Sequence, residues 1–188
     1  LKIRNQAIES ALTAIAISDM AGNLSYVNPS FLKLWGFGAS AEVIGRSAME
    51  FWQLAEKATE VIKAVETGKG WMGELSAKRK DGALFDVQLV ANLVLDDSGQ
   101  PVAMLASFLD ITERKQAEEA LKESEQEFRS VFDNAGDGIL IADPETKKFV
   151  LGNNAICRLL GYNPEEITKL GVMDIHPEKD IPYVVEQF

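Results

Sequence analysis

The sequence predicts an α+β fold, in which an antiparallel sheet carries its helices on one side, followed by a long charged helix and a partial second copy. Three observations support this prediction. Two strand-like segments are followed by short helices and then by three further strands, an order typical of such a fold. Landmarks of the first segment recur from residue 141 onward. Between the copies, apolar residues are spaced as in a coiled coil.

The first copy opens with a helix and two strands. Residues 1–12 are expected to form an incoming helix, whose apolar positions continue into the following segment and are Ile3, Ala7, Ala11 and Ile15. Two strands are expected next, one around Ile17 and one that ends at Asn28. Because Asn28 precedes Pro29-Ser30, its side chain can cap the next short helix.

A helix and three strands complete the first copy. Residues 51–65 predict an amphipathic helix that ends near Gly68, where a helix C-terminus favours a positive φ. Strands are predicted over residues 71–78, 84–95 and 102–109, joined by turns. Alternating apolar residues of the last two strands face the helices, namely Phe85, Val87, Leu89, Ala91, Leu93, Met104, Ala106 and Phe108. Residues 13–111 are therefore predicted to form one complete domain.

The front of this domain is repeated. Ile17-Ser18-Asp19 corresponds to Ile141-Ala142-Asp143, and Asn28 corresponds to Asn153. A glycine and an aromatic residue follow each asparagine at the same distance, as Gly36-Phe37 and Gly161-Tyr162. Shared spacing across several landmarks indicates a duplication. The second copy, residues 136–188, lacks counterparts of the last three strands, so we predict that it is truncated and either poorly ordered or completed by another chain.

Residues 112–135 are expected to form the helix that links the copies, with Asp110 or Thr112 capping its start. Its apolar and small residues recur at alternating intervals of four and three, the heptad spacing of a coiled coil, and are Ala117, Leu121, Ser124, Phe128, Val131 and Ala135. We expect a parallel homodimer through these helices. A solvated helix that lies along its own domain is the alternative interpretation.

Composition excludes several classes of function. The formal net charge of −10 argues against binding to a nucleic-acid backbone or to an anionic membrane surface. The single cysteine, Cys157, cannot form an internal disulfide, which fits a reducing compartment. Without a signal peptide or a long apolar run, a cytoplasmic location is expected. The start without Met suggests a segment of a longer protein, which could itself be anchored in a membrane.

Catalytic constellations are missing from the sequence. One histidine and one cysteine cannot build the usual nucleophile–base arrangements or a Cys/His metal site, and no glycine-rich phosphate loop occurs. The paired acids Asp96-Asp97 lie in a predicted turn, where acids favour the turn geometry. We therefore expect no enzymatic activity in this chain.

Taken together, three motifs resemble the PAS domain family: Tyr26-Val27-Asn28-Pro29, Leu34-Trp35-Gly36-Phe37 and the exit hexapeptide Asp110-Ile111-Thr112-Glu113-Arg114-Lys115. The resemblance covers residues 12–115 completely and residues 136–188 as a front half. It implies a PAS fold with a five-stranded antiparallel sheet, and a sensor input region, commonly of a two-component histidine kinase. Members of the family hold a small ligand or cofactor between sheet and helices and pass its state through the exit helix.

Two cofactors of the family are not expected here. Haem-binding members ligate iron through a histidine on the long helix, and residues 51–65 contain none; the only histidine, His176, lies in the second copy. Light-sensing flavin members carry a cysteine after the glycine–aromatic landmark, whereas Cys157 precedes Gly161-Tyr162. The resemblance also implies amide side chains that read the flavin ring, and the matching positions are Val87 and Phe108. Cys157 is expected to be a buried core thiol.

An FAD-binding redox sensor stays open, because such members place an asparagine at the end of the second strand and a tryptophan at the start of the third. Asn28 and Trp71 occupy those places. Each residue has a structural alternative: Asn28 as a helix cap and Trp71 as part of the core wall.

An apolar cavity is the remaining candidate site. Its expected lining, together with Asn28, comprises Phe31, Leu34, Phe51, Trp52, Trp71, Leu75, Phe85, Val87, Leu89, Met104, Ala106 and Phe108. Such walls suit a small apolar or aromatic ligand, or close packing without a ligand. In the first case occupancy would alter the last strand, which runs into Asp110, Ile111 and Thr112, and then the helix at Leu121 and Phe128. In the second case the chain is a ligand-free dimerisation and relay module.

Overall fold

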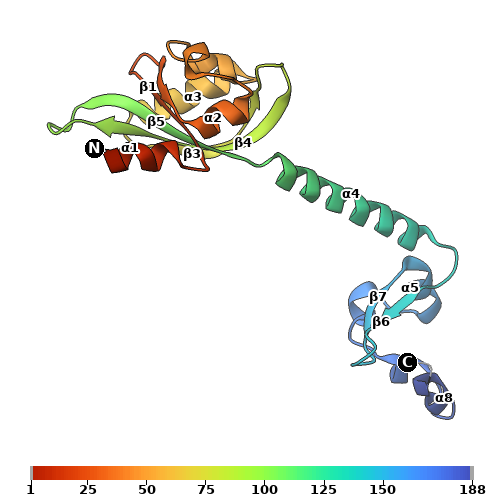
Figure 1. Cartoon of the computed structure of the whole chain (residues 1–188). Helices are drawn as coiled ribbons and strands as arrows, with labels where there is room; N and C mark the ends of the chain where they lie inside the picture. The colour runs from red at the N-terminus through yellow and green to blue at the C-terminus, as the bar shows by residue number, and fades with distance from the viewer. Residues whose placement is uncertain (1, 187–188) are drawn as a thin grey trace. The chain divides into compact units, whose positions relative to one another are not determined.

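The computed structural model of the chain describes residues 2–186 (Figure 1). The chain divides into two compact units, residues 1–117 and 118–188. Each unit has a hydrophobic core of its own.

Unit 1 is built on a five-stranded antiparallel sheet. Its strands are β1 (Ala14–Ser18), β2 (Leu24–Val27), β3 (Trp71–Lys78), β4 (Leu84–Leu95) and β5 (Pro101–Asp110), in the spatial order β2-β1-β5-β4-β3. The bounds predicted for β3 and β4 are confirmed, and β5 is one residue longer at each end than predicted. Strand β5 lies at the centre of the sheet, where it pairs with both β1 and β4.

Helices cover one face of this sheet. They are α2 (Pro29–Trp35) and α3 (Ala55–Glu66), with the short turns η1 (Ser40–Glu42) and η2 (Ala48–Phe51) between them (Figure 1). Gly36 ends α2 with a φ of 78°, a left-handed conformation that favours glycine. The sheet face toward the helices carries the alternating residues predicted from β4 and β5, and the predicted α+β fold is confirmed.

The predicted helix over residues 51–65 begins later than expected, because Phe51 ends η2 and α3 starts at Ala55. Two contacts with β3 account for the difference. Trp52 forms an isolated bridge with Ala77, and the backbone N–H of Gln53 donates to the carbonyl of Ser76 at 3.1 Å. Pairing with the edge of the sheet therefore replaces helical hydrogen bonds over these residues.

The incoming helix is also shorter than predicted. Helix α1 covers Lys2–Glu9, and Ser10 lies outside it. The predicted apolar positions Ala11 and Ile15 are not helical, because Ile15 is already part of β1; the side chain of Ile3 lies outside the described residues. The regular spacing of these apolar residues therefore does not mark one continuous helical face, because the residues are divided between a helix, the segment after it and a strand.

The linking helix α4 covers Thr112–Asn134, close to the predicted 112–135. Its predicted contact residues are exposed: Leu121 by 63 %, Phe128 by 48 % and Val131 by 70 %. Phe132 is buried instead, within unit 2, and its ring stacks on that of Phe128 with centroids 5.2 Å apart.

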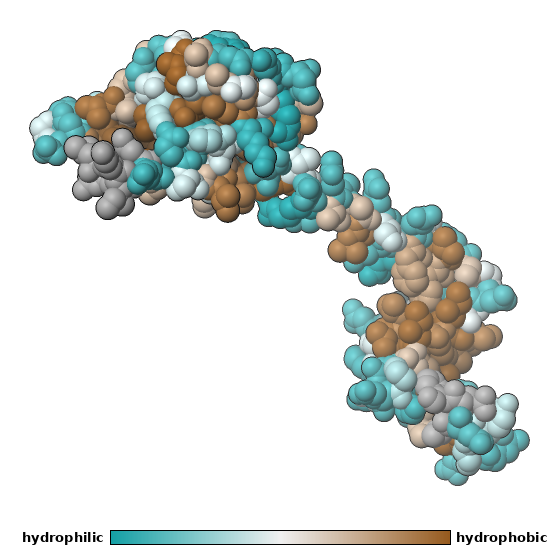
Figure 2. Space-filling model, in the orientation of Figure 1, coloured by the Kyte–Doolittle hydropathy of each residue, from teal (hydrophilic) through white to brown (hydrophobic). Residues whose placement is uncertain are grey.

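Unit 2 repeats the front of unit 1. It contains β6 (Leu140–Ala142) and β7 (Phe149–Gly152), followed by α5 (Asn154–Leu160), α6 (Pro164–Ile167), α7 (Val172–Ile175) and α8 (Ile181–Glu186). The two strands pair as β1 and β2 do. A small core is formed by Phe149, Ile156, Cys157, Ile167 and Val172, which confirms that Cys157 is a buried thiol. Apolar side chains also gather on the surface of this unit (Figure 2).

Candidate functional site

A row of small residues leaves space beneath the helices of unit 1. Ala16 on β1, Ala106 on β5 and Ala91 on β4 are direct partners across the three central strands. All three line a cavity of about 80 Å³ between the sheet and the helices. The methyl side chains of these three neighbouring alanines are too small to fill the space above the sheet, and the larger residues around them do not close it.

Seven predicted residues line this cavity: Phe31, Phe51, Trp52, Leu89, Met104, Ala106 and Phe108. The structure thus brings together residues from α2, η2, β4 and β5. That they bind a ligand stays a prediction. The wall also includes residues outside the predicted set, chiefly Trp35 on α2, Met49 in η2, and Val61 and Val65 on α3. The helical spacing of Val61 and Val65 was the signal that pointed to them.

The six other predicted residues lie elsewhere. Val87 is fully buried and Phe85 meets the ring of Trp35 edge to face, so both belong to the core beside the cavity. Leu75 lies against a separate small pocket next to Trp52. Leu34 is half-buried, because the buried positions of α2 are Phe31 and Trp35. The predicted lining therefore included sheet residues that do not border the cavity, and it omitted the residues that α3 contributes.

Asn28 is a structural joint and does not line the cavity. It is fully buried, and its Oδ1 accepts hydrogen bonds from the backbone N–H groups of Ile15 and Phe31. The bond to Phe31 confirms Asn28 as the N-cap of α2. Its Nδ2 donates to the carbonyls of Ile8, Ala11 and Thr13, which ties the end of α1 to the sheet.

Trp71, the other residue behind the resemblance to FAD-binding members, opens β3 and is half-buried. It is not part of the cavity wall, and its indole lies over Gly73, so that a Cβ at residue 73 would meet the ring at 2.6 Å. The amide of Asn28 is already committed to backbone groups. These residues, and a cavity far below the roughly 300 Å³ of a cofactor-sized pocket, do not fit FAD.

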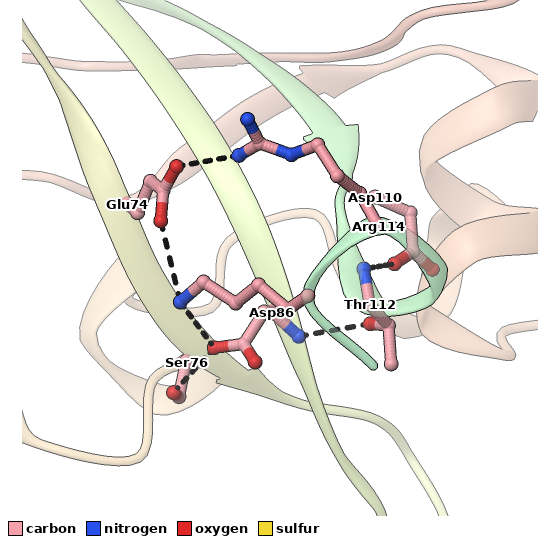
Figure 3. A network of polar contacts seen from close by, with 7 residues as sticks. Glu74, Ser76, Asp86, Asp110, Thr112 and Arg114 are labelled. Carbon is pink, nitrogen blue, oxygen red and sulfur yellow. Dashed lines mark hydrogen bonds and ion pairs between the residues drawn. The ribbon is translucent and has the colours of Figure 1, made fainter. Parts of the chain in front are cut away.

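The exit of unit 1 is held by a polar network that joins α4 to the sheet (Figure 3). The Thr112 Oγ1 accepts from the backbone N–H of Asp86 on β4, and the Thr112 N–H donates to Asp110. Lys115 lies between Glu74 on β3, at 3.3 Å, and Asp86, at 3.4 Å. Arg114 pairs with Glu74 at 2.6 Å. The first turn of α4 thus contacts two strands.

Charges in this network shift the pKa values of its members. The hydrogen bond from Arg114, and then that from Lys115, hold the pKa of Glu74 below its ordinary value of 4.5. Burial opposes ionisation of Asp110, but the hydrogen bonds from Thr112 and the ion pair with Arg79 outweigh it, so its pKa is also lowered. Both carboxylates are therefore charged at neutral pH and can hold the cations of α4.

Unit 2 receives α4 through a joint equivalent to that of Asn28. Asn153 is fully buried and caps α5, because its Oδ1 accepts from the N–H of Ile156 and also from that of Ile139. Its Nδ2 donates to the carbonyls of Phe132, in the last turns of α4, and Asp137. The duplication therefore extends from the sequence to the hydrogen bonds that attach each unit to the helix before it.

Nothing in the described part of the chain points to a metal centre or a membrane span. No group of three His, Cys, Asp or Glu side chains within residues 2–186 could hold a metal ion. No helix of these residues is long and apolar enough to cross a membrane. His176, in unit 2, contacts the carbonyl of Val172 through Nδ1.

This fold, with its cavity between sheet and helices and its exit helix, is that of a PAS domain. Models of the PAS domain match residues 12–113 and 126–186, and the first match alone covers more than half of the chain. The chain belongs to the PAS domain family. The first match includes the predicted first copy, residues 13–111, and the second covers residues 136–186 of the predicted second copy, 136–188.

Similar proteins are sensors and regulators. The chain is 39 % identical over 67 residues to a methyl sulfide methyltransferase-associated sensor of Methanosarcina acetivorans, a match that covers 36 % of this chain and 7 % of that protein. It is 26 % identical over 154 residues to a nitrogen fixation regulatory protein of Klebsiella oxytoca, covering 79 % of this chain and 30 % of the relative. The chain thus spans less than a third of either relative.

Among solved structures, an RNA-binding light-oxygen-voltage receptor is similar with a TM-score of 0.59 and 25 % identity. The match covers 66 % of this chain and 37 % of that one. Residues 1–117 of the present chain contain no cysteine, since the only one is Cys157.

Proposed function

We propose that this chain is the sensory input region of a longer signalling protein. In this proposal, unit 1 holds a small ligand in its cavity and passes its presence to α4. One observation carries the proposal: β5 contributes Met104, Ala106 and Phe108 to the cavity wall and then runs directly into the exit network at Asp110 and Thr112. Binding and relay thus share one strand.

The position of β5 supports transmission. It is paired along most of its length with β1 and β4, so it cannot move without its neighbours. Packed interiors resist compression, and a ligand larger than the empty space next to Ala106 would therefore displace the strand or the helices. Glu74 lies on β3 and Asp86 on β4, and both form ion pairs with the first turn of α4. A displacement of the sheet would therefore change the lengths of these ion pairs.

Dimerisation through α4 is part of the proposal. Leu121, Phe128 and Val131 form an exposed apolar row at heptad spacing, which a second α4 would cover. The bases and acids of the helix lie off this row. A parallel pair of helices would let both copies of unit 1 act on one output, and the catalytic steps would belong to other parts of the longer protein.

Filling the cavity tests the ligand proposal. Ala106→Leu places a larger side chain in the cavity, whereas Ala103→Leu places the same side chain on the opposite face of β5. Native mass spectrometry of the purified protein should show a small bound molecule in the wild type and in Ala103→Leu, and its loss in Ala106→Leu. An absorption spectrum of the same sample should show no flavin or haem bands.

A ligand-free dimerisation and relay module is the second candidate, and the small volume of the cavity, about 80 Å³, favours it. It predicts a dimer without any bound molecule in the same mass spectra, and equal behaviour of the two leucine variants. That result would contradict the ligand proposal and leave the dimer intact.

A further inference from the structure

The indole of Trp35, a residue that lines the cavity, carries a hydrogen-bond donor without a partner in the described part of the chain. Trp35 is fully buried and is one of the residues that line the cavity. Its Nε1–H has no hydrogen-bond partner among the described residues. Buried polar groups are paired in the great majority of cases, because an unpaired one loses its bonds to water without replacement. An unpaired donor in a residue of the cavity wall therefore calls for an acceptor.

The packing around Trp35 fixes the ring. Phe31 stacks on it at a centroid distance of 4.2 Å, and the rings of Phe51, Phe85 and Phe108 meet it edge to face. Because four aromatic contacts hold the indole, it cannot turn its N–H to solvent without dismantling the core. The donor is preorganised, which lowers the cost of binding a partner.

The rest of the wall defines the size and charge of such a partner. None of the residues that line the cavity carries a charge, so a charged ligand would lose its hydration without compensation. Besides the tryptophan N–H groups, the polar side-chain group of the wall is the hydroxyl of Ser18 on β1. The volume of about 80 Å³ admits a compact molecule only.

We propose that Trp35 Nε1–H donates a hydrogen bond to the ligand, and that the cavity selects small uncharged molecules with a hydrocarbon body and one carbonyl-type oxygen. This inference rests on the proposed function, since it requires that the cavity binds a ligand. It adds the chemical class of that ligand and the residue that recognises it.

Two probes of nearly equal shape test the inference. Cyclobutanone carries the oxygen acceptor, and methylenecyclobutane replaces that oxygen by a CH₂ group. Each is titrated into the full chain while proton–nitrogen correlation spectra follow the three indole N–H signals, which the Trp35→Phe variant assigns. Cyclobutanone should move the Trp35 Nε1–H signal downfield and bind about threefold to tenfold more tightly than the hydrocarbon, the range for one neutral hydrogen bond.

The variants separate recognition from folding. In Trp35→Phe, which keeps an aromatic ring and removes the donor, the two probes should bind equally. In Trp71→Phe, a tryptophan outside the cavity, the preference for cyclobutanone should persist. Should both probes bind the wild type equally with no shift of the Trp35 signal, the inference is wrong and the ligand cavity stands. If neither probe binds, both the inference and the ligand proposal fail.

Discussion

Among single residues, two asparagines, one in each unit, have the same structural role. Asn28 and Asn153 each cap a helix and each donate to carbonyls of the segment that enters the unit. An amide supplies both a donor and an acceptor, so one side chain satisfies backbone groups on either side of it. No apolar residue, and no carboxylate, can replace it in both roles.

Replacing Asn28 by alanine should lower the free energy of unfolding of unit 1 by on the order of 2–4 kcal/mol, because two buried N–H groups lose their acceptor. Urea denaturation followed by tryptophan fluorescence measures this, since Trp35, Trp52 and Trp71 all lie in unit 1. Asn153→Ala is the matched control in unit 2 and should leave the fluorescence transition in place. A similar shift in both variants would contradict the separate roles of the two joints.

The hydroxyl of Tyr26 should ionise at a higher pH than that of an exposed tyrosine. Burial, and then its hydrogen bond to Glu9 of α1, raise the pKa of Tyr26 to about 12. A pKa raised on folding gives stability that is present below the ordinary value of 10 and is lost as the pH rises through 12. Ultraviolet titration of tyrosinate should therefore contain a component near pH 12 that Tyr26→Phe removes. Persistence of that component in the variant would assign it to another group.

At the scale of elements, the strands were the most predictable part of the molecule. Alternating apolar residues and two glycine-containing turns fix β3 and β4, since side chains of a strand alternate faces. The start of α3 was not predictable, because the bridge between Trp52 and Ala77 is a long-range contact. Trp35 was missed as a cavity residue for a related reason: which face of α2 is buried depends on packing against the sheet.

The exit network should loosen in acid. The pKa of Glu74 is lowered in the folded state. Its ion pairs therefore stabilise the fold fully above the ordinary pKa of 4.5, and this stabilisation is lost as the pH falls through the lower pKa of the folded state. Glu74→Gln should mimic this change and speed amide exchange over residues 112–117 up to about fivefold, the limit for an exposed ion pair. Hydrogen-exchange mass spectrometry measures it.

Glu50→Gln is the control for this variant, because it breaks an exposed pair with Arg46 that does not touch α4. It should leave exchange over residues 112–117 unchanged. Equal acceleration in the two variants would show that the network does not hold the helix.

The apolar row on α4 should carry dimerisation. Phe128→Asp or Leu121→Asp places a charge in the proposed seam and should shift the protein to monomers in analytical ultracentrifugation, with unit 1 still folded by tryptophan fluorescence. Gln126→Asp adds the same charge on the opposite side of the heptad and should remain dimeric. A dimer that survives both seam variants would rule out this interface.

At the scale of the whole molecule, the two units differ in how much core they possess. Unit 1 has a five-stranded sheet with an extensive core, whereas unit 2 has two strands and a small one. The repeat in the sequence predicted this difference, because the second copy lacks the three later strands. It did not predict that residues 140–186 form defined elements around a core of their own.

Unit 2 should therefore be the less stable part, since a small core offsets less of the entropy lost on folding. Limited proteolysis should cut within residues 136–186 before it cuts within 14–110, leaving a resistant fragment that mass spectrometry identifies. Earlier cleavage of unit 1 would contradict this order.

The chemistry of the two attachments has one more consequence, for the ionic strength of the surroundings. Unit 1 is entered through a neutral, buried amide at Asn28, but it is left through partly exposed ion pairs at Glu74, Arg114 and Lys115. Dissolved salt screens exposed charges and leaves a buried amide unaffected. A rise in salt concentration should therefore weaken the attachment of the outgoing helix and leave that of the incoming segment unchanged. Under the proposed relay, the coupling between unit 1 and α4 would then fall as the ionic strength rises.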